Sequence, residues 1–177
     1  MANSEAPIRS KQISKLVAAL AAEAPRGFLP PSEGTRSSSE HILAFSHVKN
    51  TRGYIERVAN QINGCYERGW FDGCAVMMRR MIETLIIECY ETEKIADQIK
   101  NAKTGEFYML RDLINKILSQ PEFNIGRGAK QGLGRLKEIG DYSAHSRRYN
   151  AHREDIDRVA GDFRVVCQEL LYLAKLK

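Results

Sequence analysis

A short polar stretch ahead of the last apolar segment holds the side chains whose types and spacing could do chemistry. Directly after Gly140 come Asp141, His145, Arg147 and Arg148. An imidazole takes up and releases protons near neutral pH, and closely spaced guanidinium groups attract anions. The chain runs off a helical pattern into this stretch, and a second helical pattern follows it. We therefore expect a basic polar site that two packed elements hold in place.

Asp141 and His145 are spaced so that they can act together. They are four positions apart, and on a continuing helical turn the carboxylate would hydrogen-bond and orient the imidazole. This arrangement would serve a catalytic and a structural histidine equally. A metal site is the weaker interpretation, because no third ligand stands near the pair.

Arg79 and Glu83 are expected to support that site from another helix. They are four positions apart and flank a core face formed by Met78, Ile82 and Leu85. One interpretation is an exposed ion pair worth less than about 0.5 kcal/mol. The other interpretation places the pair beside the polar stretch, where it would hold the reacting side chains in position.

Arginines are dense around the polar stretch, which makes a polyanion a reasonable partner. The chain has a formal net charge of +5, and Arg147, Arg148, Arg153 and Arg158 follow one another closely. Arg148, Tyr149 and Arg153 are the candidate nucleic-acid contacts, because such side chains stack on bases; a solvated turn is the alternative. These cations are not arranged so that one helix could present them to the edges of bases. Contacts to phosphates should therefore dominate, and binding should weaken steeply with salt.

The elements that must position these residues are helices throughout. Apolar residues recur at spacings of three and four without an alternating strand pattern, which predicts an all-α fold. We expect an N-terminal helical arm with a Pro/Ser-rich linker over residues 1–39, and a bundle of four to five core helices over residues 40–177. Helices are predicted over 8–24, 40–48, 51–68, 71–93, 107–121, 126–139 and 151–175.

Single residues set the ends and contacts of these helices. Gly69 is expected to close an antiparallel hairpin whose end Trp70 plugs. The glycines between 126 and 134 allow a helix to approach a neighbour closely, since the order of a phosphate-binding loop is missing. Asn150 is the expected N-cap of the last helix. The regular apolar stripe of that helix predicts a bundle seam or the seat of a second subunit; its residues are Ile156, Val159, Phe163, Val166, Leu170 and Leu173. The expected core joins three of these, Val159, Phe163 and Val166, to Leu136, Ile139 and the face of Met78, Ile82 and Leu85.

Composition narrows the class of protein further. No apolar run is long enough for a membrane span and no signal peptide is visible, so we expect a cytoplasmic protein without a membrane role. Four cysteines without paired spacing are interpreted as reduced core residues, and no metal or cofactor is implied. They are Cys65, Cys74, Cys89 and Cys167.

Two motifs, taken with their order and helical setting, resemble a known family. The runs Arg79-Arg-Met-Ile-Glu83 and Ile139-Gly-Asp-Tyr-Ser-Ala-His145 match the "RRxxE" and "(I/L)G(N/D)xxAH" motifs of small bacterial helical domains in the HEPN superfamily. The resemblance covers about residues 50–175 and implies a HEPN-like helical bundle, often dimeric. It also implies metal-independent ribonuclease activity in a defence or toxin–antitoxin setting.

The resemblance assigns roles to the polar stretch. His145 would be the general acid or base at a ribose 2′-hydroxyl, and Arg147 or Arg148 would stabilise charge on the phosphorane. In the ribonuclease signature, four to six residues separate an arginine from the histidine. Five positions before His145 this chain has Gly140 instead of arginine. Arg147 with His152 satisfies the spacing in another register. The expected function is therefore a homodimer acting on RNA or a nucleotide. The alternative is a non-catalytic HEPN-like module that dimerises or docks a partner protein.

Overall fold

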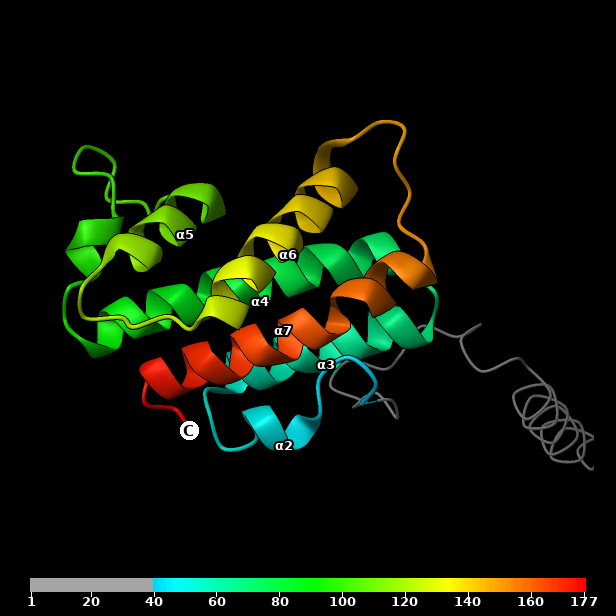
Figure 1. Cartoon of the computed structure of the whole chain (residues 1–177), viewed down its shortest axis with the longest axis horizontal. Coiled ribbons are helices and arrows are strands. Elements are labelled where there is room, and N and C mark those ends of the chain that lie inside the picture. The colour runs from blue at the N-terminus through cyan, green and yellow to red at the C-terminus, as the bar shows by residue number, and fades with distance from the viewer. Residues whose placement is uncertain (1–39) are drawn as a thin grey trace, which may run out of the picture. The chain divides into compact units, whose positions relative to one another are not determined.

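The structure, a computed structural model, describes residues 40–177 (Figure 1). In these residues there is no strand beyond one isolated bridge, which confirms the all-α prediction. The helix predicted over 8–24 lies outside the described residues. The elements are α2 (Phe45–Val48), α3 (Gly53–Glu67), α4 (Phe71–Thr92), η1 (Ala96–Ile99), α5 (Leu110–Ser119), α6 (Arg127–His145) and α7 (Arg153–Leu173).

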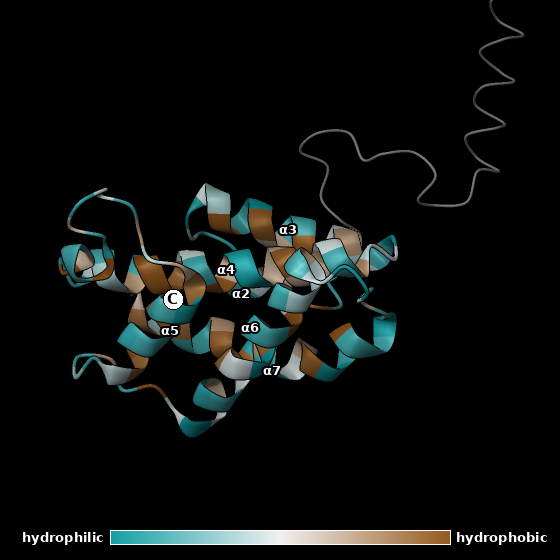
Figure 2. Cartoon of the chain, turned by 90° about the horizontal axis from the view of Figure 1, so that it is seen from above, coloured by the Kyte–Doolittle hydropathy of each residue, from teal (hydrophilic) through white to brown (hydrophobic). Residues whose placement is uncertain are grey.

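Helix α4 is the centre of the bundle and packs against α3, α5, α6 and α7. Its apolar residues are spread over several faces because neighbouring helices cover it on several sides. Figure 2 shows the resulting alternation of hydrophobic and hydrophilic residues along the helices. The predicted core is confirmed, since every residue expected there is buried: Met78, Ile82, Leu85, Leu136, Ile139, Val159, Phe163 and Val166.

Helices α3 and α4 form the predicted hairpin, which turns at Gly69. This glycine has a φ of 75°, a conformation that side chains disfavour, and the backbone N–H of Trp70 donates to the carbonyl of Cys65 at 2.8 Å. The prediction that Trp70 plugs the hairpin is wrong, because 51 % of its surface is exposed. Backbone hydrogen bonds close the turn, so the indole is not needed there.

Helix α7 carries the predicted apolar stripe, and the stripe is used within the chain. Of its residues, Ile156, Val159, Phe163, Val166 and Leu170 are buried, mostly against α6 and α4, and Leu173 at its end is partly buried. The stripe is therefore a bundle seam. A second subunit would have to use other residues, and the homodimer stays a prediction.

The first turn of α7 differs from the prediction, because His152 rather than Asn150 is the N-cap. The helix begins at Arg153, and the backbone N–H of His152 donates to Asp155 Oδ2 at 2.9 Å. An acidic side chain in the first turn satisfies a donor that the helix leaves unpaired and suits the positive end of the helix dipole.

The chain ahead of α3 is less helical than predicted, and a buried amide side chain explains why. Asn63, which is 4 % exposed, accepts hydrogen bonds from the backbone N–H groups of Ile42 and Leu43 at 3.1 Å each. Its own Nδ2 donates to the Leu43 carbonyl at 2.8 Å, and Arg164 donates to the carbonyls of His41 and Ile42. Tertiary hydrogen bonds replace helical ones here, so α2 contains only the last four residues of the predicted helix.

The glycine-rich segment is helical, and one of its glycines allows the predicted close approach. A Cβ added to Gly132 on α6 would lie 3.0 Å from Val166 Cγ2 and 3.2 Å from Asp162 Cβ, both on α7. A larger residue would push the two helices apart. The segment is thus a packing element between α6 and α7.

Two expectations based on composition can be compared with the structure. All four cysteines are unpaired and lie on helices; three are buried, and Cys65 is partly exposed. Burial raises the pKa of Cys74 and of Cys89 to about 12, which keeps these thiols protonated. Among the described helices, none has the length and apolar character that a membrane span requires.

Candidate functional site

Helix α6 does not end at Gly140 but continues for five residues to His145, so the polar stretch begins on a helix. Gly140 is buried where α6 packs on α4, and a Cβ added there would lie 2.8 Å from the Cβ of Arg79. Carbon atoms that are not bonded do not approach so closely without repulsion, so a larger residue requires the helices to move. The position at which the ribonuclease signature carries arginine is a packing contact in this chain.

The carboxylate of Asp141 binds two cationic side chains and not the imidazole of His145. Its Oδ1 accepts a hydrogen bond from Arg79 Nε at 3.1 Å, and its Oδ2 accepts one from Lys137 Nζ at 2.5 Å. The expected Asp141–His145 hydrogen bond is therefore wrong. Partial burial acts to raise the pKa of Asp141, but the hydrogen bonds and charges of Lys137 and Arg79 outweigh it and lower that pKa below its ordinary value.

Arg79 joins the two predicted motifs. Besides Asp141, its guanidinium contacts Glu83, with Nη1 3.6 Å from Oε2, and only 22 % of the Arg79 side chain is exposed. Glu83, Arg79, Asp141 and Lys137 thus form a chain of alternating charges across α4 and α6. The expected Arg79–Glu83 pair is present, and its arginine lies beside the polar stretch. Sequence reasoning missed Lys137, although its position four residues before Asp141 was a usable signal.

The remaining side chains of the polar stretch are open to solvent. His145 is the last residue of α6, and Arg147 and Arg148 follow it in the connection 146–152; all three are exposed. Neither arginine forms an ion pair with another of the residues 40–177. Two free guanidinium groups and one imidazole are therefore available to an anion that approaches the end of α6.

Tyr149 is less accessible than the sequence suggested. Its ring lies 5.7 Å from the ring of Tyr142, measured between centroids, and Tyr142 is the more open of the two, at 50 % exposed. Burial, followed by the nearby charge of Asp155, raises the pKa of Tyr149. Tyr142 is thus the better base-stacking surface, and sequence reasoning missed it because a helical tyrosine gives no signal of its exposure.

The connection after Tyr149 is fixed to the start of α4. The backbone N–H of Ala151 donates to Asp72 Oδ1 at 3.0 Å. This contact joins residues far apart in the sequence, and nothing in the local pattern indicated it. It brings the α3–α4 turn and the α6–α7 connection to the same end of the bundle (Figure 1).

Arg153 is engaged by aromatic rings rather than free for a ligand. Its guanidinium carbon lies 4.7 Å from the ring centroid of Tyr66 and 5.3 Å from that of Phe71. The Tyr66 hydroxyl in turn donates to Asp157 Oδ1 at 2.5 Å. Such cation–π contacts hold the guanidinium in place, so Arg153 is more a part of the α7 packing than of the site.

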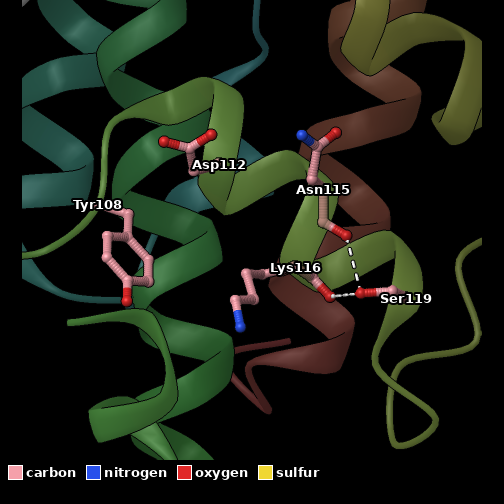
Figure 3. A pocket seen from close by; sticks show the side chains of 5 residues that line it. All are labelled: Tyr108, Asp112, Asn115, Lys116 and Ser119. Atoms are coloured by element: carbon pink, nitrogen blue, oxygen red, sulfur yellow. Dashed lines mark hydrogen bonds between the residues drawn. The ribbon is translucent and has the colours of Figure 1, made fainter. Parts of the chain in front are cut away.

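A hollow on the molecule lies apart from the predicted site. It has a volume of about 430 Å³ on α5 and the chain just before it. In Figure 3 the Ser119 hydroxyl donates to the carbonyls of Asn115 and Lys116, at 2.9 and 3.0 Å, and so caps its own helix. The lining residues include none of the predicted site residues: Tyr108, Asp112, Asn115, Lys116 and Ser119.

Neither a metal site nor a similarity to known proteins assigns a function. Within residues 40–177, no three His, Cys, Asp or Glu side chains are grouped so that they could hold a metal ion. The chain matches no protein-family model, no curated protein and no solved structure. A functional assignment therefore depends on the side chains described above and on the two motifs that resemble the HEPN group.

Proposed function

We propose that the protein binds RNA at the junction of α6 and α7 and cleaves it with its own side chains. The observation that carries the proposal is the exposure of His145, Arg147 and Arg148 at the end of α6. The carboxylate of the preceding turn, Asp141, is already bound by two cations. A phosphate at this place would therefore meet two guanidinium groups and an imidazole without facing an unpaired Asp141.

The proposed reaction is transfer of a phosphodiester to the neighbouring 2′-hydroxyl. His145 takes the 2′-hydroxyl proton while the 2′-oxygen bonds to phosphorus. Arg147 or Arg148 offsets the charge on the phosphorane, the bond to the 5′-oxygen breaks, and that oxygen takes up a proton. The products carry a 2′,3′-cyclic phosphate and a 5′-hydroxyl. Asp141 has no part in the proton transfer in this scheme, and it acts with Arg79 and Glu83 to hold α6 on α4.

A second function is favoured by the same network. Asp141 does not orient His145, and Gly140 packs on Arg79 where the ribonuclease signature has an arginine. An imidazole without an orienting partner is not held in the tautomer and orientation that accept the proton. A non-catalytic module that docks a partner protein, or a second copy of itself, is therefore the alternative.

The test is incubation of structured and unstructured RNA with the wild type and with variants, in the presence of EDTA. His145→Ala should slow cleavage by about 10²–10⁴-fold, while DNA should be inert because it lacks the attacking hydroxyl. His152→Ala tests the other register of the signature, since His152 is also exposed. Cleavage that survives His145→Ala but is lost in His152→Ala would move the general base to His152, the N-cap of α7. RNA that stays intact with the wild type would favour the docking module.

Dimerisation and biological setting belong to the proposal as well. A homodimer acting in defence or in a toxin–antitoxin pair accords with the HEPN resemblance, and its interface must avoid the buried stripe of α7. Light scattering at tens of micromolar protein should give twice the mass of one chain. A monomer at that concentration would remove the dimer from the proposal and leave the cleavage test unaffected.

A further inference from the structure

Trp70 is placed where an aromatic contact with a ligand is possible. It is the one tryptophan of the chain, it stands at the turn between α3 and α4, and 51 % of its surface is exposed. Glu67, Arg68 and Gly69 precede it; Phe71, which is partly buried against the core, and Asp72 follow it. An isolated exposed aromatic residue is common on proteins, so exposure alone assigns nothing.

Two hydrogen bonds fix the backbone that carries the indole, and a guanidinium group lies over the ring. The backbone N–H of Trp70 donates to the Cys65 carbonyl, and its own carbonyl accepts from Cys74, both at 2.8 Å. The Arg68 guanidinium carbon lies 5.8 Å from the indole centroid, while Arg68 Nη1 donates to the Gly64 carbonyl at 3.2 Å. A ring that has a fixed backbone and a cation over it loses less conformational entropy when a second ring stacks on it than a ring on a mobile backbone would lose.

The same end of the bundle carries the free arginines of the proposed RNA site. Asp72, two residues after Trp70, accepts the hydrogen bond from Ala151 at 3.0 Å. Arg147 and Arg148 are at most four residues before Ala151, which places their Cα atoms no more than roughly 14 Å from it even in an extended chain. Figure 1 shows the α3–α4 turn and the α6–α7 connection at this end.

We propose that Trp70, supported by Arg68, stacks on an unpaired nucleobase of an RNA whose phosphates contact Arg147 and Arg148. This inference rests on the RNA-binding function proposed above and adds a base-binding subsite to it. Every nucleobase has a π face, so stacking is tolerant of sequence, and the cation beside the indole suits a polyanion. A partner protein would instead be expected to bury Trp70 among further exposed apolar residues. The apolar residue next to it, Phe71, is partly buried and packs against the core instead.

Because Trp70 is the one tryptophan, its fluorescence reports this subsite directly. We would titrate the full chain with a single-stranded RNA about twelve nucleotides long, a fully paired RNA, and inorganic polyphosphate. RNA with an uncleavable 2′-O-methyl backbone separates binding from cleavage. The single strand should quench the emission, and the duplex and the polyphosphate should not, because neither offers an unpaired base.

Variants complete the test, with binding followed by anisotropy of a labelled RNA. Trp70→Ala should weaken single-strand binding by roughly 5- to 150-fold, and Trp70→Phe by less because a phenyl ring still stacks. Tyr172→Ala is the matched control: Tyr172 is 72 % exposed but lies near the opposite end of α7, and its loss should leave affinity unchanged. Thermal unfolding of each variant checks that the fold is kept.

The outcomes separate the subsite from the function on which it rests. If RNA binds through Arg147 and Arg148 but neither quenches Trp70 nor depends on it, the subsite is wrong and the proposed function stands. Equal quenching by polyphosphate would also overturn it, since the effect would then be electrostatic. If no RNA binds at all, both proposals fail. If Trp70→Ala instead abolishes self-association, the indole is a protein contact.

Discussion

Gly140 lies so close to Arg79 that a methyl group on the glycine would come within 2.8 Å of the arginine Cβ. The arginine extends from this contact to the carboxylate of Asp141, which Lys137 also binds. Close packing and charge pairing at the crossing of α4 and α6 therefore depend on each other. A change at one of these positions alters the position of the polar stretch that follows.

Replacement of Gly140 by alanine should destabilise the protein by about 1–3 kcal/mol, because the new methyl group overpacks the crossing of the two helices. Gly134→Ala is the control on the same helix, since a Cβ there meets no atom within 4 Å. That change should stabilise the protein by about 0.5–1 kcal/mol through the higher helix propensity of alanine. Urea unfolding of both variants measures the difference, and equal effects would mean that the crossing is looser than described.

The network around Asp141 should make stability depend on acid pH. The pKa of Asp141 is lowered in the folded state, so its stabilising effect is present above the pKa of an unfolded aspartate and is lost as the pH falls through the folded value. Wild type should therefore exceed Asp141→Asn in free energy of unfolding near neutral pH, and the gap should close in acid. Asp97→Asn, at a side chain that is 96 % exposed, should show almost no such trend. A gap that widens in acid would contradict the assignment.

Phe163 is fully buried on α7, and its truncation tests the orientation of that helix. Phe163→Ala should cost roughly 3–5 kcal/mol, because it removes apolar contacts and leaves a cavity. Val165→Ala, two residues along the helix and 46 % exposed, should change stability by less than about 0.5 kcal/mol. Chemical denaturation gives both values, and a small effect at Phe163 would mean that the face assigned to the core is wrong.

RNA binding, if it uses Arg147 and Arg148, should be governed by the phosphate backbone. Affinity should fall steeply between about 50 mM and about 200 mM salt, and each arginine replaced by alanine should reduce the slope of the log–log plot by roughly 0.7. Arg111→Ala on α5 removes one exposed positive charge elsewhere and serves as the control. Affinity that is flat across this range would show that these arginines do not bind phosphate.

Helical periodicity was sufficient to predict most of the fold. The stripes through α4 and α7 recur at helical spacing, and burial of their residues depends only on which face is apolar. Two of the errors occurred where one polar side chain overrode the local pattern. Asn63 draws the backbone of Ile42 and Leu43 into tertiary hydrogen bonds, and His152 caps α7 in place of Asn150.

The sequence predicted which residues form the candidate site but not which of them bind one another. The spacing of Asp141 and His145 allowed a hydrogen bond, and the choice of Arg79 and Lys137 instead depends on how α4 and α6 pack. Gly140 was noticed only as a missing arginine. Its packing role became visible only when the second helix was in place, because a glycine in the sequence does not indicate what lies beside it.

Asn63 also ties Ile42 and Leu43 into the cooperative structure of the bundle. The amide protons of these two residues belong to no helix, yet both are donated to the side-chain oxygen of Asn63, which is buried on α3. Exchange of these protons with deuterium requires the Asn63 side chain to leave its position, which means opening the bundle rather than a loop. These two amides should therefore exchange as slowly as those of α3, and a shortened chain that starts at α2 would lack the contacts that hold its own first turn.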